Sequence, residues 1–146
     1  MQVFRSFEQG DISMVGRAVR VLLVSSDGET GVLARRLAAL GARVDVIDEI
    51  FAAISDVIDD PMGYGLLVVD CDSANVGGLS AGQHAVQMMG GSARRVPAML
   101  ISGECQAQAF PQDRNAAVVL RAPLSAVSLK VGYEHALRER FLYQAA

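Results

Sequence analysis

The chain has 146 residues, of which 51% are hydrophobic, 20% charged and 5% aromatic, and its net charge is -3. This length predicts one domain with a substantial core, and the composition excludes a mainly disordered chain. The mildly acidic balance argues against a nucleic-acid partner, and no apolar run is long enough for a membrane span or a signal peptide, so we expect a cytoplasmic protein without membrane attachment.

Five apolar runs predict β-strands. Residues 21–24, 66–69, 98–101 and 117–120 are continuously apolar, which is typical of strands buried on both faces of a parallel sheet. Residues 43–47 alternate between polar and apolar side chains, which indicates an edge strand.

Helical periodicity separates these strands. Capping patterns and terminal Gly or Pro residues mark the expected helix boundaries, and the segment before Pro111 gives the weakest pattern. The predicted helices run from Ser26 to Gly41, from Asp48 to Pro61, from Ser80 to Gly90, from Glu104 to Phe110 and from Ser125 to Phe141.

The alternation of strands and helices predicts an α/β fold. It favours a flavodoxin-like three-layer sandwich, with a five-stranded parallel sheet of order 2-1-3-4-5 and helices on both faces. Residues 1–17 form an N-terminal extension, either a frayed tail or an element that packs on a partner, and residues 18–146 form the domain.

The carboxyl ends of the strands are where an open parallel sheet binds ligands. Each of these positions also has an ordinary explanation, because Asp and Ser are common in turns and helix caps. The residues that follow the strands are Ser25, Ser26 and Asp27; Asp70, Cys71 and Asp72; Ser102, Gly103 and Glu104; and Arg121, Ala122 and Pro123.

Four segments resemble strands of a known family, in the same order along the chain. Residues 20–24, 65–70, 96–103 and 120–124 resemble the first, third, fourth and fifth strands of a CheY-like receiver domain of two-component response regulators. The resemblance covers residues from about 19 to 141. It implies a phosphorelay signalling function, and it places Asp70 at the position of the phosphoaccepting aspartate.

The chain departs from the receiver pattern at its chemical positions. The family's acidic pair, which binds Mg²⁺, falls on Ser25 and Ser26, its phosphoryl-binding lysine on Ala122, and its aromatic switch residue on Val119. Hydroxyls bring Mg²⁺ little charge, and alanine cannot stabilise a transferring phosphoryl group. We therefore expect no Mg²⁺ and no other cofactor.

Two interpretations of the Asp70 pocket remain open. Asp70 is either a phosphoacceptor or a strand-end carboxylate of ordinary acidity that binds neighbouring loop groups, and we favour the second. A one-residue bulge after the first strand would bring Asp27 beside Asp70, where the pair could recruit a metal ion. Ser102 completes the predicted pocket.

The resemblance predicts a non-enzymatic pseudo-receiver that acts through protein contacts. Its partner would be a histidine kinase or a separate output protein, and a homodimer is plausible. Two alternatives stay open: a phosphorylatable single-domain receiver that uses Asp70, and a small-molecule sensor that uses the vacated pocket. The expected partner surface contains Val119, Arg121, Val127, Lys130, Val131 and Tyr133.

The remaining metal and redox candidates carry weaker signals. Cys71 and Cys105 form no disulfide framework and are expected to be small buried residues, although a redox contact between them is conceivable. His84 and His135 share no metal-ligand spacing, which favours surface or half-buried histidines.

Overall fold

The computed structural model describes residues 19–91 and 95–145 of the chain. The predicted extension over residues 1–17 lies outside these residues, as does the predicted start of the domain at residue 18. No helix in the described part combines the length and apolarity that a membrane crossing needs.

Five strands form one parallel sheet: β2 (Arg20–Val24), β3 (Arg43–Ile47), β4 (Leu66–Asp70), β5 (Ala98–Ser102) and β6 (Val118–Arg121). Their order is β3-β2-β4-β5-β6, which confirms the predicted 2-1-3-4-5 order. The short edge strand β3 has the alternating pattern expected of it, with exposed Arg43 and Asp45.

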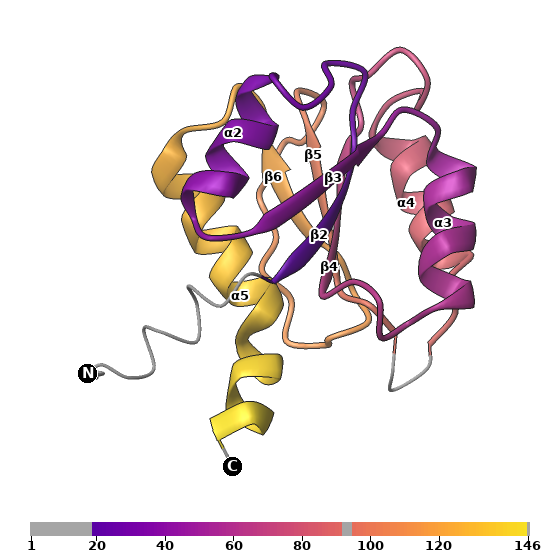
Figure 1. Ribbon diagram of the computed structural model, residues 1–146. Coiled ribbons are helices and arrows are strands. Elements are labelled where there is room, and N and C mark those ends of the chain that lie inside the picture. Colours follow the sequence, from indigo (N-terminus) through magenta and orange to yellow (C-terminus); the bar gives the residue numbers. More distant parts are fainter. Residues whose placement is uncertain (1–18, 92–94, 146) are drawn as a thin grey trace.

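In the described part of the chain, four helices complete the three layers: α2 (Val32–Ala39), α3 (Ile50–Asp59), α4 (Leu79–Gln87) and α5 (Ala126–Ala145). Helices α2 and α5 cover one face of the sheet, and α3 and α4 cover the other (Figure 1). The predicted α/β sandwich is therefore confirmed.

Each central strand contributes to two hydrophobic cores, because successive side chains point to opposite faces. In β4, for example, Leu66 and Val68 pack with α2 and α5, whereas Leu67 and Val69 pack with α3 and α4. All four side chains are fully buried. This burial on both faces explains why the strands are apolar without alternation.

Three predicted helix starts are wrong. Helix α2 begins at Val32 after Gly31, without a side-chain cap, rather than at Ser26. Helix α3 is capped by Glu49, one residue after the predicted Asp48, because the Glu49 carboxylate accepts bonds from the backbone N–H groups of the first turn.

The start of α4 depends on a distant residue. The helix begins at Leu79 rather than at the predicted Ser80. The residue before it, Gly78, has no side chain that could cap the helix. The Leu79 N–H instead donates to the Glu104 carboxylate, 2.8 Å away. A negative charge suits the positive end of the helix dipole, and Glu104 supplies it from the loop after β5.

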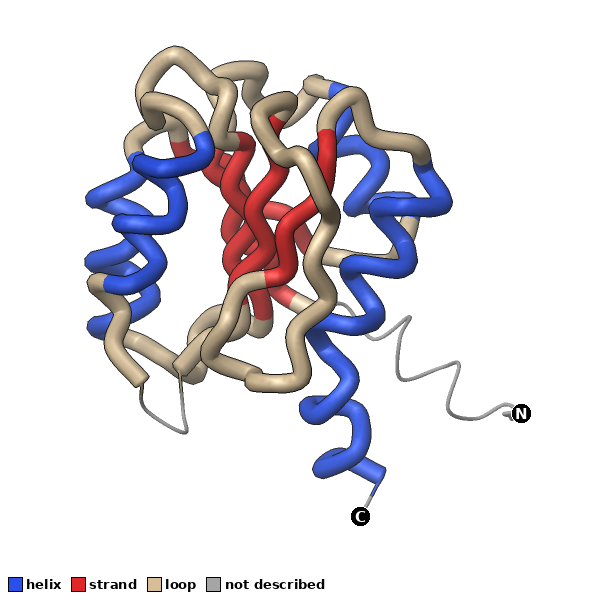
Figure 2. Tube along the Cα trace, turned by 180° about the vertical axis from the view of Figure 1, so that it is seen from behind, coloured by secondary structure: helices blue, strands red, loops and turns tan. Residues whose placement is uncertain are grey.

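The helix predicted from Glu104 to Phe110 does not form. The described segment between β5 and β6 is a loop of turns and bends, in which Ala109 makes an isolated antiparallel bridge to Val119 of β6. The two residues exchange backbone hydrogen bonds of 2.9 and 3.0 Å. The loop thus satisfies the free edge of β6, as Figure 2 shows along one side of the sheet, and this pairing outweighs local helix propensity.

Candidate functional site

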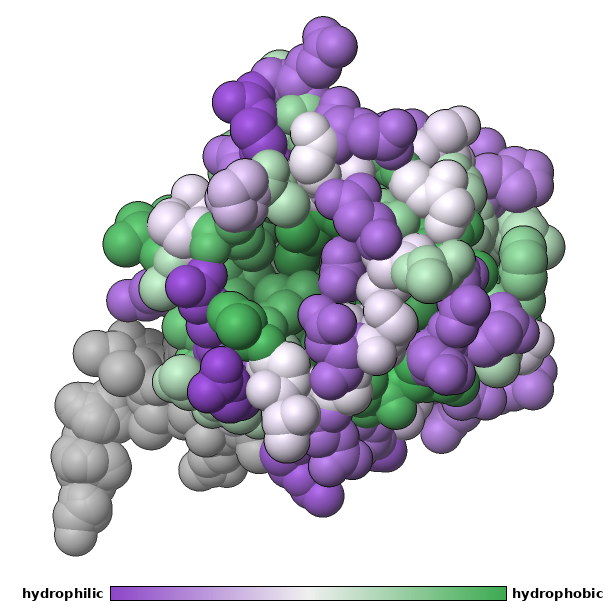
Figure 3. Space-filling view, turned by 90° about the horizontal axis from the view of Figure 1, so that it is seen from above, coloured by the Kyte–Doolittle hydropathy of each residue, from purple (hydrophilic) through white to green (hydrophobic). Residues whose placement is uncertain are grey.

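The carboxyl ends of the strands bring the predicted pocket residues to one end of the sheet. Ser25 follows β2, Asp70 and Ser102 end β4 and β5, and Ala122 follows β6. Figure 3 looks down on this end of the molecule, where hydrophilic residues lie beside an apolar hollow. The topology therefore places the sequence-predicted residues in a common region.

Asp70 is held by hydroxyl groups of its own chain. The Ser73 and Ser25 hydroxyls donate to Oδ2 of Asp70 at 3.2 and 3.4 Å, respectively. Ser73 and Ser25 are both buried, and the Ser73 hydroxyl also accepts a 3.0 Å bond from the backbone N–H of Ser26. These contacts tie the loop after β2 to the loop after β4.

The acidity of Asp70 differs from the expectation. Partial burial raises the pKa of its carboxyl, the Ser73 and Ser25 hydrogen bonds lower it, and the neighbouring carboxylates of Asp27 and Asp72 raise it further. The prediction of ordinary acidity is wrong, because desolvation and like charges together outweigh the two hydroxyl donors.

Asp72 is one of the residues named above at the carboxyl ends of the strands, and the sequence predicted no specific contact for it. Its Oδ1 accepts a 2.7 Å bond from the Ser102 hydroxyl, and its Oδ2 accepts a 2.7 Å bond from the Gly103 N–H. Ser102 therefore contacts Asp72 rather than Asp70. The available signal was an aspartate two residues beyond a buried strand, facing the loop after the neighbouring strand.

Ala122 lies beside this polar cluster and brings no charge to it. Its N–H donates to the Ser102 carbonyl at 3.1 Å, and the residue is half-buried. The two charged groups that raise the pKa of Asp70, those of Asp27 and Asp72, are both negative.

Several oxygens of this pocket hydrogen-bond within the chain, among them those of Ser25, Asp70 and Asp72. Mg²⁺ favours several carboxylate and water oxygens in octahedral geometry. Here the Ser25 hydroxyl already donates to Asp70, and the exposed Asp27 reaches Ser25 through its backbone N–H at 3.2 Å. Within residues 19–91 and 95–145, no group of three or more acidic, histidine or cysteine side chains could hold a metal ion.

The predicted partner surface divides between two places. Val127 and Val131 lie on α5 with 72% and 49% of their surfaces exposed, so they do not complete the core. Lys130 lies exposed between them, and Arg121 is exposed on β6. Tyr133, in contrast, is fully buried against the sheet, so its assignment to the surface is wrong.

Val119 faces away from α5. Its neighbours Val118 and Leu120 belong to the core beneath α2 and α5, so the alternation of the strand turns Val119 to the opposite face. There it lines a cavity beside α4 with Leu100. Val119 therefore does not form a continuous surface with Val127 and Val131.

Both cysteines and both histidines have structural environments. Cys71 and Cys105 are buried free thiols, and burial raises the pKa of Cys71 to about 12. His84 is exposed, whereas the half-buried His135 ring lies 2.7 Å from the Pro111 carbonyl oxygen. The histidine environments agree with the predicted surface and half-buried positions.

The fold is that of CheY-like receiver domains. The receiver domain of a sensor histidine kinase from Pseudomonas aeruginosa, solved with magnesium coordinated in its active-site cleft, matches with a TM-score of 0.61 and 18% identity, over 83% of this chain and 98% of that chain. The beryllofluoride-activated NtrC4 receiver domain dimer matches with a TM-score of 0.58 and 19% identity, over 82% and 97% of the two chains.

A longer protein shares the same fold in part. The anti-anti-sigma factor PhyR from Bartonella quintana matches with a TM-score of 0.58 and 18% identity, over 93% of this chain and 54% of that chain. No family model and no curated protein matches the sequence. The likeness therefore establishes the receiver fold, while the chemistry of this chain must be argued from its own residues.

Proposed function

We propose that this protein is a pseudo-receiver, a signalling module that acts through protein contacts without Mg²⁺-dependent phosphorylation of Asp70. The observation that carries the proposal is the environment of Asp70. Its carboxylate accepts hydrogen bonds from Ser25 and Ser73. The neighbouring charges that act on this carboxylate, those of Asp27 and Asp72, are negative.

This environment opposes phosphoryl transfer for an electrostatic reason. Transfer to a carboxylate spreads negative charge over the phosphoryl oxygens, which receivers of the family balance with a metal ion and a lysine. Ser25, Ser26 and Ala122 supply neither charge. Further negative charge beside Asp27 and Asp72 would be repelled rather than stabilised.

The exposed surface of α5 supports the signalling part of the proposal. Val127 and Val131 are four residues apart, and both are exposed on the same side of the helix around Lys130. Two large apolar side chains on one exposed stripe favour contact with another protein. The NtrC4 receiver forms a dimer, so a second copy of this chain is one partner to test beside a signalling protein.

Incubation with Mg²⁺ and acetyl phosphate, followed by intact mass measurement, tests the proposal. We expect no added phosphoryl group on the wild-type chain. An adduct that disappears in Asp70→Asn would overturn the proposal in favour of the phosphorylatable receiver.

A restored variant provides the positive control. Ser25→Asp, Ser26→Asp and Ala122→Lys together return the acidic pair and the cation that the receiver family uses. If loss of these groups explains the inactivity, the triple variant gains an adduct that depends on both Mg²⁺ and Asp70. If its circular dichroism spectrum is native but it remains unmodified, the explanation by these three positions is contradicted.

A further inference from the structure

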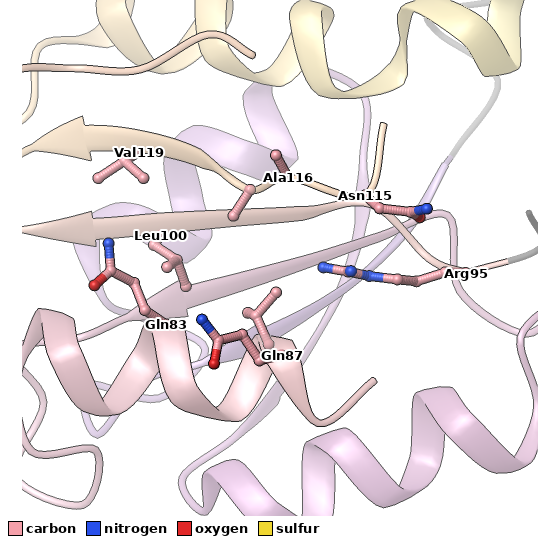
Figure 4. A pocket seen from close by; sticks show the side chains of 9 residues that line it. Gln83, Gln87, Arg95, Leu100, Asn115, Ala116 and Val119 are labelled. Atoms are coloured by element: carbon pink, nitrogen blue, oxygen red, sulfur yellow. The ribbon is translucent and has the colours of Figure 1, made fainter. Parts of the chain in front are cut away.

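A second candidate site lies on the face of the sheet that α4 covers, away from Asp70. It is a cavity of about 430 Å³, within the range of roughly 300–1,000 Å³ typical of small-molecule sites. Figure 4 shows glutamines of α4 on one side, Leu100 and Val119 of the sheet on the other, and Arg95 and Asn115 together at one end. The lining residues are Gln83, Val86, Gln87, Arg95, Leu100, Asn115, Ala116, Ala117 and Val119.

The cavity exists because no helix forms in the segment between β5 and β6. A helix at this place in a doubly wound fold would cover the outer strands, β5 and β6, next to α4. Here Ala109 pairs with the edge of β6 instead, and the loop lies along the sheet edge. The space beside α4 over Leu100 and Val119 is left to the cavity.

Arg95 is the charged group of this cavity. Its side chain is only 9% exposed, and its Nη1 donates to the Gly90 carbonyl at 2.9 Å. Its Nε–H is buried and has no hydrogen-bond partner among the residues that the structure describes. Burial lowers the pKa of this guanidinium, and the negative charge of Asp113 raises it.

The described residues place no carboxylate in ion-pair contact with Arg95. A buried cation that lacks a counter-ion and keeps a free donor has an unfavourable environment, which a bound anion would relieve. Guanidinium groups bind carboxylates through pairs of N–H donors. Arg95 is thus suited to an anionic group that enters from the cavity.

Asn115 offers a second polar atom that a ligand could contact. Its Oδ1 is buried without a hydrogen-bond partner, so this end of the cavity can accept a hydrogen bond from a ligand donor. Val86, Leu100 and Val119 offer apolar contact further along. Gln83 and Gln87 lie one helical turn apart and are exposed at the rim.

We propose that this cavity binds a small carboxylic acid with an apolar body and a hydroxyl or N–H donor. Arg95 holds the carboxylate through its free Nε–H, Asn115 Oδ1 accepts the bond from the donor, and the apolar body lies over Val86, Leu100 and Val119. The site is independent of the proposed pseudo-receiver function, because no residue that lines it shares a side-chain hydrogen bond described for Asp70 or Asp72.

The test uses 4-hydroxyphenylacetate and hexanoate as probes in an NMR titration of the whole chain. The first probe carries a carboxylate, a ring and a hydroxyl donor, whereas the second lacks the donor. We expect saturable shifts of the Arg95 Nε–H and of backbone amides around Asn115 and Val119. Hexanoate should bind about tenfold more weakly, because the Asn115 acceptor then stays unsatisfied.

Two comparisons isolate the role of the charge. The neutral 4-hydroxyphenylacetamide should bind at least tenfold more weakly than 4-hydroxyphenylacetate to the wild-type chain. Arg95→Met should weaken 4-hydroxyphenylacetate at least tenfold, whereas Arg43→Met, at the opposite edge of the sheet, should leave its affinity unchanged. The amide comparison needs no variant, so the test stands even where Arg95→Met fails to fold.

A further variant tests the cavity itself. Val119→Phe fills the space over β6 and should abolish the shifts while the spectrum stays that of a folded chain. The proposal is overturned if neither acid gives saturable shifts up to about 10 mM, if the amide binds as tightly as the acid, or if the shifts map to Asp70. These results leave the acetyl phosphate experiment untouched, so the two proposals fail separately.

Discussion

Asp70 and Arg95 are charged side chains placed at opposite ends of the sheet, and the chain treats them differently. Asp70 ends β4 and receives hydrogen bonds from two hydroxyls of neighbouring loops. Arg95 precedes β5, is more deeply buried, and keeps an unused Nε–H at the end of a cavity. The Asp70 carboxylate thus has hydrogen-bond partners within the fold, whereas the Arg95 Nε–H can still donate to a ligand.

This difference points to the cavity beside α4, rather than the Asp70 pocket, as the place where a ligand would find an unused hydrogen-bond donor. At the carboxyl end, the carboxylates of Asp70 and Asp72 accept hydrogen bonds from serine hydroxyls and from a loop N–H group. At the cavity, a missing helix has exposed a face of the sheet. If the contrast is real, the groups around Asp70 are buried and hydrogen-bonded, whereas the cavity has space for added atoms. Four measurements test this, from the largest expected effect to the smallest.

The largest effect is expected at Cys71, directly after Asp70. Burial raises the pKa of its thiol from 9.0 to about 12, so the thiolate fraction near pH 8 falls about a thousandfold. Labelling with a thiol reagent in a Cys105→Ser background should therefore be about a thousandfold slower in the native chain than in denaturant. Comparable rates in the two conditions would show that this end opens readily, which would remove the contrast with the cavity.

The second effect contrasts the filled face with the cavity. A Cβ atom at Gly132 of α5 would lie 2.8 Å from Leu120 Cδ1 and 3.1 Å from the Met99 sulfur. Gly132→Val should therefore lower the free energy of unfolding by about 3 kcal/mol. Val119→Phe should change it by about 1 kcal/mol or less, because the added ring enters existing space. Urea unfolding measures both, and equal costs would contradict a real cavity.

The third effect removes a hydroxyl that satisfies Asp70. Ser73→Ala should lower the free energy of unfolding by about 1–2 kcal/mol, because the Asp70 carboxylate and the Ser26 N–H both lose a partner. It should also raise the pKa of Asp70 further, which carboxyl NMR can follow. The exposed Ser80 offers a matched control, and equal stabilities of Ser73→Ala and Ser80→Ala would show that the hydroxyl contacts carry no weight.

The smallest effect is a pH dependence. Because the folded state raises the pKa of Asp70 above its unfolded value of roughly 3.9, the native chain is penalised once Asp70 ionises, and this penalty disappears as pH falls. Asp70→Asn should therefore be more stable than wild type near pH 7 by a few tenths of a kcal/mol, since solvent screens the half-buried group. Thermal unfolding should show the advantage vanishing near pH 3.5. An advantage that grows on acidification would mean that the shift has the opposite sign.

Much of the fold follows from local patterns in the sequence. The continuous apolar runs identify the strands because residues buried on both faces of a sheet must all be apolar, and the alternation in residues 43–47 marks the edge strand. Strand and helix alternation then limits the sheet to a few orders, of which the observed one was predicted. The helix starts were less accurate, since Gly31 and Gly78 provide no side-chain signal and the α4 cap comes from Glu104, 25 residues away.

The sequence by itself determined that Ser25 and Ser26 follow the first strand and that Ala122 follows the last, because the identity of a residue at a strand end needs only the position of the strand. Tertiary structure decided the partners of those residues. It paired Ser102 with Asp72, buried Tyr133, turned Val119 toward the cavity and replaced a predicted helix by an edge pairing. These outcomes depend on contacts between segments far apart in the chain, whose energies exceed the local preferences that a sequence pattern records.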